Sequence, residues 1–267
     1  MKDKPRVLVL KADGTNRDME MAYAFEIAGG DPNIVHVNQL RGKEKKMSDY
    51  QILALPGGFA YGDDIVSGKI LSIELTSFLG EQMKKFIERK DTAIIGVCNG
   101  FQVLVRTGLL PFRKVGDMDV TLTNNDSGHF ECRWIKVKKN NKNNSKFLEG
   151  MDEKIIWLPV AHGEGKFIGN TETLNKIETQ NLVAFRYVDD NGNPTKNYPD
   201  NPNGALNAIV GITDITGRIL GMMPHPECFV RVEQHPNWRR PDFVKTQSGK
   251  GQGLPLFENI VKFVKEA

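Results

Sequence analysis

Short apolar runs alternate with longer amphipathic stretches in the part of the chain before Pro111. The apolar runs cover residues 6–10, 34–37, 51–55 and 93–97, and the stretches with helical periodicity cover residues 18–28 and 65–89. Such alternation is typical of βαβ units, in which neighbouring strands are parallel. A run such as AIIGV, apolar at every position, fits a strand that is buried on both faces. This part of the chain therefore predicts a parallel sheet flanked by helices.

Beyond Pro111 the pattern changes to β-like stretches separated by long polar loops. These stretches cover residues 130–137, 155–160, 182–188, 208–212 and 218–223. The composition of residues 138–146 and 189–204 predicts an exposed loop and a series of turns, and an amphipathic helix over residues 254–265 is expected to cover the sheet. We expect an α/β fold with one domain over residues 1–267: a mostly parallel central sheet flanked by helices, with additional antiparallel strands.

Composition and charge exclude several classes of protein. Hydrophobic residues make up 39% and charged residues 26%, and the formal net charge is +3 with both signs mixed along the chain. This balance lacks the concentrated basic face of a nucleic-acid-binding protein, so we expect no nucleic-acid partner. No apolar stretch approaches the roughly 18 to 20 residues that cross a bilayer. The apolar run at residues 7–10 is too short for an export signal, so we expect no membrane role and a cytoplasmic location.

Cys98 is a candidate nucleophile. The segment AIIGVCNGFQVLVRTG predicts a strand, a sharp turn through Cys98 and Gly100, and then a helix, which is the order found in the nucleophile elbows of hydrolases. A helix N-terminus favours thiolate over thiol, and its free backbone N–H groups, here on Asn99 and its neighbours, can bind an oxyanion. The alternative is that Cys98 is a small buried apolar residue, the structural interpretation that we prefer for Cys132 and Cys228. Three cysteines at wide spacings favour neither a disulfide framework nor a zinc site.

His225 and Glu227 are candidates for a general base and the group that orients it. The predicted strand RILGMM leads into PHPECF, which places both residues just past a strand end. In extended backbone, residues two apart project to the same side, so the carboxylate could hold the imidazole in one tautomer while it exchanges protons with Cys98. The alternative is a surface histidine beside a solvated carboxylate. Of the other histidines, only His162, in AHGEG, has a context that suggests a site.

A glycine-rich turn follows the predicted strand at residues 51–55. The turn reads PGGFAYGDDI, and its Gly57 and Gly58 would allow backbone to approach a reacting carbonyl closely, with an N–H group opposite that of Asn99. The pattern GxxxxGK[ST] is absent from the chain, so we expect no ATP-binding P-loop. A plain tight turn is the competing interpretation.

Together, the segments PGGFAYGDD, GVCNGFQ and MMPHPE resemble the class I, or triad-type, glutamine amidotransferases. More narrowly, DGTN at residues 13–16, SGHFECRW at 127–134, AHGEGKF at 161–167 and NPNGALNAI at 201–209 are similar to the family of glutaminase subunits of phosphoribosylformylglycinamidine synthase, a purine-biosynthesis enzyme. The resemblance covers almost the whole chain. It implies a single-domain, flavodoxin-like glutamine amidotransferase fold.

The resemblance also implies a reaction and its participants. L-glutamine would be hydrolysed to glutamate and ammonia by Cys98, His225 and Glu227, and the ammonia would pass to a synthetase subunit that uses ATP to amidate formylglycinamide ribonucleotide. ATP and magnesium are then expected on the synthetase, with no cofactor or metal in this chain. A small third subunit is a further partner that the resemblance allows.

The resemblance assigns the glutamine pocket to matching positions. Gly57 and Gly58 would provide oxyanion and backbone contacts, and Gln102, one helical turn past the cysteine, would face the bound amino acid. Phe130 and His162 lie in matching segments near the pocket.

Two positions depart from the commonest pattern of the family. Arg17 stands where a cysteine is frequent, and Cys228 stands where an arginine is frequent.

Two other functions remain open. One is a stand-alone cysteine hydrolase of the related peptidase-like families, which commonly have histidine where Asn99 follows the cysteine. The other is a catalytically silent scaffold subunit, although such loss usually removes a triad residue.

Overall fold

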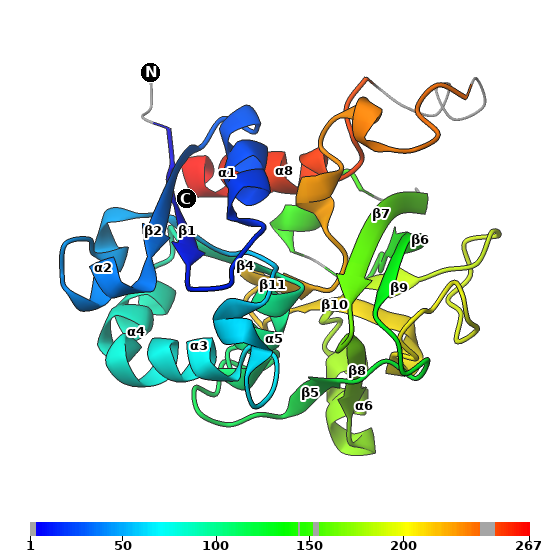
Figure 1. The fold of residues 1–267 in the computed structure, drawn as a ribbon, viewed down its shortest axis with the longest axis horizontal. Helices are drawn as coiled ribbons and strands as arrows, with labels where there is room; N and C mark the ends of the chain where they lie inside the picture. Colours follow the sequence, from blue (N-terminus) through cyan, green and yellow to red (C-terminus); the bar gives the residue numbers. More distant parts are fainter. Residues whose placement is uncertain (1–3, 144, 152–154, 241–248) are drawn as a thin grey trace.

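A nine-stranded mixed sheet runs through the centre of the computed structural model, which describes residues 4–143, 145–151, 155–240 and 249–267 (Figure 1). The strand order is β2-β1-β3-β4-β11-β10-β9-β6-β7. Pairing is parallel from β2 to β11 and antiparallel from β11 to β7. The expected combination of a parallel sheet with added antiparallel strands is confirmed, and the antiparallel part is as wide as the parallel part.

The strands of the central sheet have the following bounds: β1 Arg6–Lys11, β2 Asp31–His36, β3 Ile52–Leu55, β4 Ala93–Val97, β6 Glu131–Lys139, β7 Ile155–His162, β9 Val183–Tyr187, β10 Ile209–Thr213 and β11 Ile219–Met222. A separate two-stranded sheet pairs β5 (Val120–Thr123) with β8 (Lys166–Gly169). The helices are α1 Asp18–Ile27, α2 Val37–Arg41, α3 Lys69–Ile73, α4 Gly80–Glu88, α5 Asn99–Arg106, α6 Thr171–Thr179 and α8 Leu254–Glu266.

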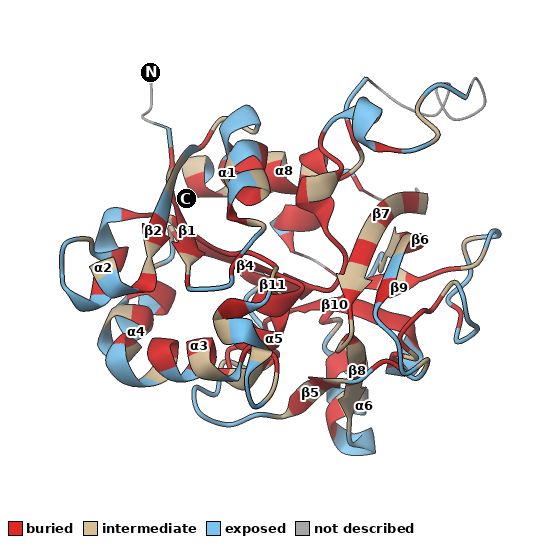
Figure 2. Cartoon of the chain, in the orientation of Figure 1, coloured by how far each residue is buried: buried red, intermediate tan, exposed pale blue. Residues whose placement is uncertain are grey.

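Helices cover both faces of the parallel part of the sheet. Helices α1 and α8 lie on one face, and α3, α4 and α5 lie on the other (Figure 1). Every residue of β3, β4 and β11 is buried, as expected for strands that are covered on both sides, and these strands form the centre of the core in Figure 2. Helix α8 closes the fold as predicted, because its Phe257 packs edge-on against Phe25 of α1 at a centroid distance of 5.0 Å.

The prediction of one helix over residues 65–89 is wrong. A π-helical turn, Glu74–Phe78, separates α3 from α4, and the backbone N–H of Leu79 donates to Glu74 O at 3.0 Å. Thr76 Oγ1 donates to Ser72 O at 2.9 Å, a local bond that competes with regular helix geometry. Helical periodicity alone does not reveal such an extra residue in one turn.

The prediction that residues 138–146 form an exposed loop is also partly wrong. Strand β6 continues to Lys139, and Asn143 is buried. The Asn143 amide donates to Asn181 O at 3.0 Å and to Thr213 Oγ1 at 2.9 Å. The buried Asn143 amide therefore donates hydrogen bonds to backbone and side-chain oxygens that lie far away in the sequence. None of the helices in the described ranges combines the length and hydropathy that a bilayer crossing requires.

The contact between α1 and α8 predicts a measurable loss of stability. Phe25 is fully buried, so Phe25→Ala should lower the free energy of unfolding by about 3–5 kcal/mol through lost burial and a residual cavity. Met19→Ala on the same helix is the control, because Met19 is 69% exposed and its truncation should cost less than about 0.5 kcal/mol. Urea unfolding followed by circular dichroism measures both. Equal losses would contradict this account of the core.

Candidate active site

Three neighbouring parallel strands deliver the main candidate residues to one edge of the sheet. Gly57 follows β3, Cys98 follows β4 and His225 follows β11, and these strands are adjacent in the order β3-β4-β11. Carboxyl ends of parallel strands meet at the same edge, where ligands of open α/β sheets bind. The fold therefore brings Cys98 and His225, which are far apart in the sequence, to the same edge of the sheet.

Cys98 is held in a strained conformation between β4 and α5. Its φ of 51° and ψ of −107° are unusual for a residue with a side chain, and its backbone N–H donates to Met222 O at 2.8 Å. The side chain is 6% exposed, and Sγ lies 3.6 Å from Ala161 O at the end of β7. The predicted order of strand, sharp turn and helix is therefore present, with the Cys98 sulfur at the N-terminus of α5.

His225 and Glu227 form a buried pair beside Cys98. His225 Nδ1 lies 2.6 Å from Glu227 Oε1, and the two residues are 3% and 0% exposed. The backbone N–H of His225 donates to Pro159 O at 2.9 Å, which fixes the start of the segment against β7. Our expectation of extended backbone is wrong, because Pro226–Cys228 form a single 3-10 turn. The two side chains meet across this turn.

The surroundings of His225 strengthen it as a proton acceptor. Burial by itself lowers the pKa of His225, but Glu227 and Cys98 oppose this effect and raise the pKa to about 10. The bond to Glu227 uses Nδ1, and Nε2 has no other hydrogen-bond partner among the described residues. Nε2 is therefore the nitrogen left to exchange a proton with the Cys98 sulfur.

Gly57 lies against His225 and Cys98, whereas Gly58 lies against Asn16 and Gly14. A Cβ on Gly57 would be 2.6 Å from His225 Cε1 and 3.3 Å from Cys98 Cβ. Gly58 has a φ of 126°, and a Cβ there would be 2.6 Å from the backbone nitrogen of Asn16. Only glycine fits at either position, and at Gly57 this leaves backbone atoms facing Cys98 and His225.

The side chains of Asn99 and Gln102 tie the loops around the site to α5. Asn99 Nδ2 donates to Asp63 Oδ1 at 2.9 Å and to Gln102 Oε1 at 3.1 Å, and Gln102 Nε2 donates to Glu164 O at 2.6 Å. Both ends of the Gln102 amide are thus engaged within the protein. Burial raises the pKa of Asp63, a residue that the sequence patterns did not single out although it lies in the PGGFAYGDD segment.

His162 is a buried neutral imidazole at the end of β7. Burial, followed by the charge of nearby His225, lowers the pKa of His162 to about 3. Its Nδ1 lies 3.1 Å from Asn125 Oδ1, while Asn125 Nδ2 donates to His162 O at 2.7 Å and to His129 O at 2.9 Å. This amide orientation makes Nδ1 the donor, so Nε2, which has no partner in the described structure, is an acceptor. Asn125 was not predicted, because the TLTNNDSG segment carries only turn signals.

Phe130 lies at the rim of the site. It is 52% exposed and stacks on Phe59, which is 44% exposed, with ring centroids 6.2 Å apart. A Cβ on Gly163, next to His162, would be 3.9 Å from the Phe130 ring. The aromatic pair therefore joins the loop after β3 to the start of β6.

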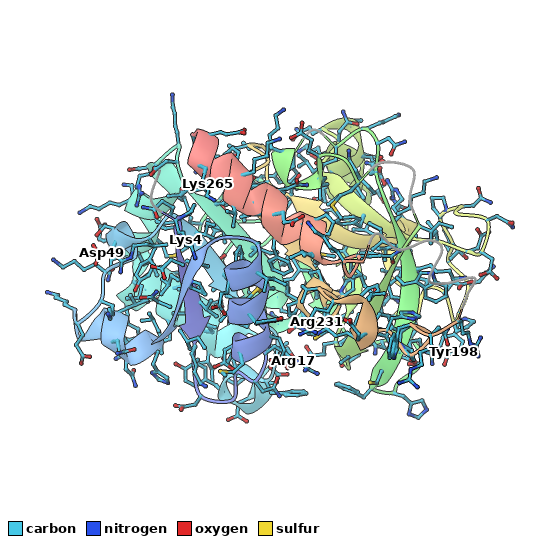
Figure 3. The ribbon with its side chains drawn as sticks, turned by 90° about the horizontal axis from the view of Figure 1, so that it is seen from above. Lys4, Arg17, Asp49, Tyr198, Arg231 and Lys265 are labelled. Carbon is cyan, nitrogen blue, oxygen red and sulfur yellow. The ribbon has the colours of Figure 1, made fainter. Side chains whose placement is uncertain are left out.

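The two positions that depart from the family pattern lie near each other. Arg17 precedes α1 and pairs with Glu20 at 2.7 Å, and Figure 3 shows it at the end of that helix. Burial opposes the charge of Arg17, but nearby Cys228, Glu20 and Glu227 raise its pKa. An arginine is thus present near Glu227, although it precedes α1 and does not directly follow the glutamate.

Comparisons with known proteins show the family to which the chain belongs. The chain matches the family described as CobB/CobQ-like glutamine amidotransferase domain over residues 4–264. It is 44% identical over 263 residues to phosphoribosylformylglycinamidine synthase subunit PurQ of Dehalococcoides mccartyi, covering 98% of this chain and 99% of that one. It is 38% identical over 268 residues to the PurQ subunit of Methanococcus maripaludis strain C7, covering 97% of each chain.

Solved structures give the same result for the fold. A chain in the structure of PurLQS from Thermotoga maritima superposes with a TM-score of 0.72 at 29% identity, covering 97% of this chain and 99% of that chain. The glutaminase domain of Trypanosoma brucei CTPS with bound acivicin has a TM-score of 0.57 at 13% identity, covering 98% and 94%. The second likeness concerns the fold alone.

The close approach of Gly57 to His225 predicts that a larger residue at position 57 slows the reaction of Cys98 with alkylating agents. In Gly57→Ala the new methyl group would displace the imidazole of His225, so alkylation of Cys98 by iodoacetamide at neutral pH should slow at least about tenfold. Gly80→Ala is the matched control, because a Cβ there meets nothing within 4 Å. Mass spectrometry of the Cys98 peptide measures the rate, with exposed Cys132 as the internal reference. Equal Cys98 rates in both variants would contradict the close approach of Gly57 to the imidazole.

The raised pKa of His225 predicts a pH dependence of stability. Between about pH 6.5, the unfolded value, and about pH 10, the folded protein holds a proton that the unfolded chain has lost. The stabilisation is complete below this window and disappears as the pH rises through it. The difference in unfolding free energy between wild type and His225→Gln should therefore shrink from about pH 6.5 to about pH 10. A constant or growing difference in urea unfolding experiments would be inconsistent with this coupling.

Proposed function

The chain belongs to the CobB/CobQ-like glutamine amidotransferase family and is the glutaminase subunit of a phosphoribosylformylglycinamidine synthase, and on that premise we propose that Cys98, His225 and Glu227 are its catalytic triad. The observation that carries this assignment is the His225–Glu227 contact of 2.6 Å beside a cysteine at a strained strand-to-helix turn. One glutamine amidotransferase type 1 domain over residues 1–267 contains the whole site.

Cys98 acts as the nucleophile on the side-chain amide of L-glutamine. In the reactive form His225 already carries the proton on Nε2, and the deprotonated Sγ of Cys98 forms a bond to the amide carbon. The carbonyl oxygen becomes an oxyanion, which the backbone N–H of Asn99 and an N–H of the Gly57–Gly58 turn stabilise. His225 then protonates the amide nitrogen, and the carbon–nitrogen bond breaks. Ammonia departs, and a thioester remains on Cys98.

Water completes the cycle. His225 accepts a proton from water as the oxygen attacks the thioester carbon, and the carbon–sulfur bond breaks to release glutamate and restore the thiol. Glu227 touches the imidazole throughout and holds the proton on Nδ1, so that Nε2 always faces the reacting atoms. Its complete burial keeps solvent from competing for this bond.

The remaining candidates bind and orient glutamine. His162 offers an unpaired acceptor nitrogen among the described residues that can receive an N–H of the substrate, and Asn125 fixes its orientation. Gln102 forms the back of the pocket through its bonds to Asn99 and Glu164 O. Phe130, stacked on Phe59, covers the rim.

The ammonia is consumed by a partner. We assign ATP and magnesium to a synthetase subunit, since the chain carries no P-loop pattern, and the acceptor is formylglycinamide ribonucleotide. A small third subunit completes the assembly that we propose, in line with the likeness to a chain of PurLQS. We place this assembly in the cytoplasm, where phosphorylated intermediates are retained.

The triad assignment predicts opposite results for two nitrogen sources. In complex with the synthetase, Cys98→Ala should release glutamate from glutamine at least about 10³-fold more slowly than wild type. The same complex should still form product from ammonium chloride, because the variant removes only the nucleophile. Cys132→Ser, at an exposed position on β6, is the control and should leave glutamate release unchanged.

The same assay separates the alternatives. Glutamine hydrolysis by Cys98→Ala at the wild-type rate would refute the triad. Loss of both reactions at once would show that Cys98 matters for assembly rather than for chemistry. A wild-type complex that uses ammonium chloride but never releases glutamate would indicate a silent scaffold, and a chain that hydrolyses amides without ever supplying a synthetase would indicate a stand-alone hydrolase.

A further inference from the structure

Two residues of the proposed triad also belong to a cluster of side chains that could bind a metal ion. His225, Glu227 and Cys228 each offer one such atom, and the three atoms lie within 4.8 Å of one another. Cys228 directly follows the triad glutamate, and its backbone N–H donates to His225 O at 3.2 Å. The turn that presents the base and its orienter therefore also presents a thiol for which glutamine hydrolysis has no use.

The three atoms form a donor set that suits zinc. Structural and catalytic zinc sites combine imidazole nitrogen, thiolate sulfur and carboxylate oxygen, and two donors around one tetrahedral ion are roughly 3.3–3.6 Å apart. Because the three atoms lie within 4.8 Å of one another, one ion between them could be bound by all three once the His225–Glu227 contact of 2.6 Å opens. Moreover, Glu227 Oε2 is buried without a hydrogen-bond partner in the described structure, so one anionic oxygen of the cluster remains available.

Charge and access also permit a cation. Cys228 is partly exposed whereas His225 and Glu227 are buried, so the thiol gives the cluster its route to solvent. Burial and the charge of Glu227 raise the pKa of Cys228, and the thiol keeps its proton until a metal ion displaces it. Arg17 is a cation nearby, but its charge is offset by Glu20 at 2.7 Å.

We propose that His225, Glu227 and Cys228 form an inhibitory site for zinc, with the fourth position open to water. Binding releases the thiol proton of Cys228 to solvent, and His225 coordinates in its neutral form, so any proton that it carries is released as well. An imidazole whose lone pair holds a metal ion has no lone pair left for the Cys98 proton. Zinc therefore stops the first step of hydrolysis until a chelator removes it.

Metal binding is tested without any catalytic step. Cys98→Ala removes the other thiol that could pair with His225, so a metal ion bound by this variant reports on Cys228. Cobalt(II) is the probe, since its bond to a thiolate gives a charge-transfer absorption in the near ultraviolet. Titration of Cys98→Ala should produce this absorption with one cobalt ion per chain.

Two double variants decide whether the cobalt lies at the proposed site. In Cys98→Ala/Cys228→Ser the absorption should disappear and the cobalt affinity should fall at least about tenfold. In Cys98→Ala/Cys132→Ser, which removes the exposed cysteine on β6, both should be retained. Cobalt binding that is equally strong in the two double variants, or that is absent from Cys98→Ala itself, would overturn the proposal.

The inhibition of glutamine hydrolysis by zinc rests on the proposed triad, and it is measured separately from metal binding. Glutamate release by the complex with the synthetase is measured against each variant's own metal-free rate. Zinc should inhibit wild type, a chelator should restore activity, and Cys228→Ser should need at least about tenfold more zinc. Equal zinc sensitivity of wild type and Cys228→Ser would place the ion on Cys98 and His225 and refute an inhibitory role for Cys228. The cobalt titration stands even if Cys98 is not the nucleophile, so failure of the triad and failure of the metal site are distinguishable.

Discussion

The contact of 2.6 Å between His225 Nδ1 and Glu227 Oε1 is the interaction on which the site depends. A carboxylate that is 0% exposed is costly unless a partner compensates its charge, and the imidazole supplies that compensation. In return, the carboxylate fixes the tautomer of the imidazole and raises its proton affinity. The rest of the local structure serves to keep this pair in place. A 3-10 turn sets the spacing, Pro159 O anchors the backbone of His225, and a glycine leaves room on the side of β3.

Much of this arrangement could be predicted because it follows from local patterns. Fully apolar runs such as residues 93–97 identify strands buried on both faces, and the order of such strands and helices fixes a parallel sheet. Since the carboxyl ends of parallel strands meet, the positions of Gly57, Cys98 and His225 after their strands were sufficient to bring them together. The roles that we propose for these residues follow from their chemistry once they are neighbours.

The parts that were not predicted depend on contacts between distant segments. Asn125 orients His162, and Asp63 holds Asn99, yet both lie in loops whose composition indicates only turns. Asn143 was expected at the surface and is buried, because its amide satisfies groups near residues 181 and 213. Asparagine is typical of exposed turns, but its amide can also replace missing backbone partners inside a protein. The sequence carries no local signal that distinguishes these two uses.

The same requirement that would make the proposed triad effective would also make it sensitive to its neighbours. A general base needs an electron-rich, preorganised nitrogen close to a carboxylate, and these are the properties that attract a metal ion. Most of the approach to this pair is closed by packing, since His225 and Glu227 are almost completely buried. Cys228, the residue after Glu227, is the partly exposed member of this group. A positively charged side chain there would repel cations, whereas the thiol of Cys228 offers a ligand atom, and the charge of nearby Arg17 is offset by Glu20.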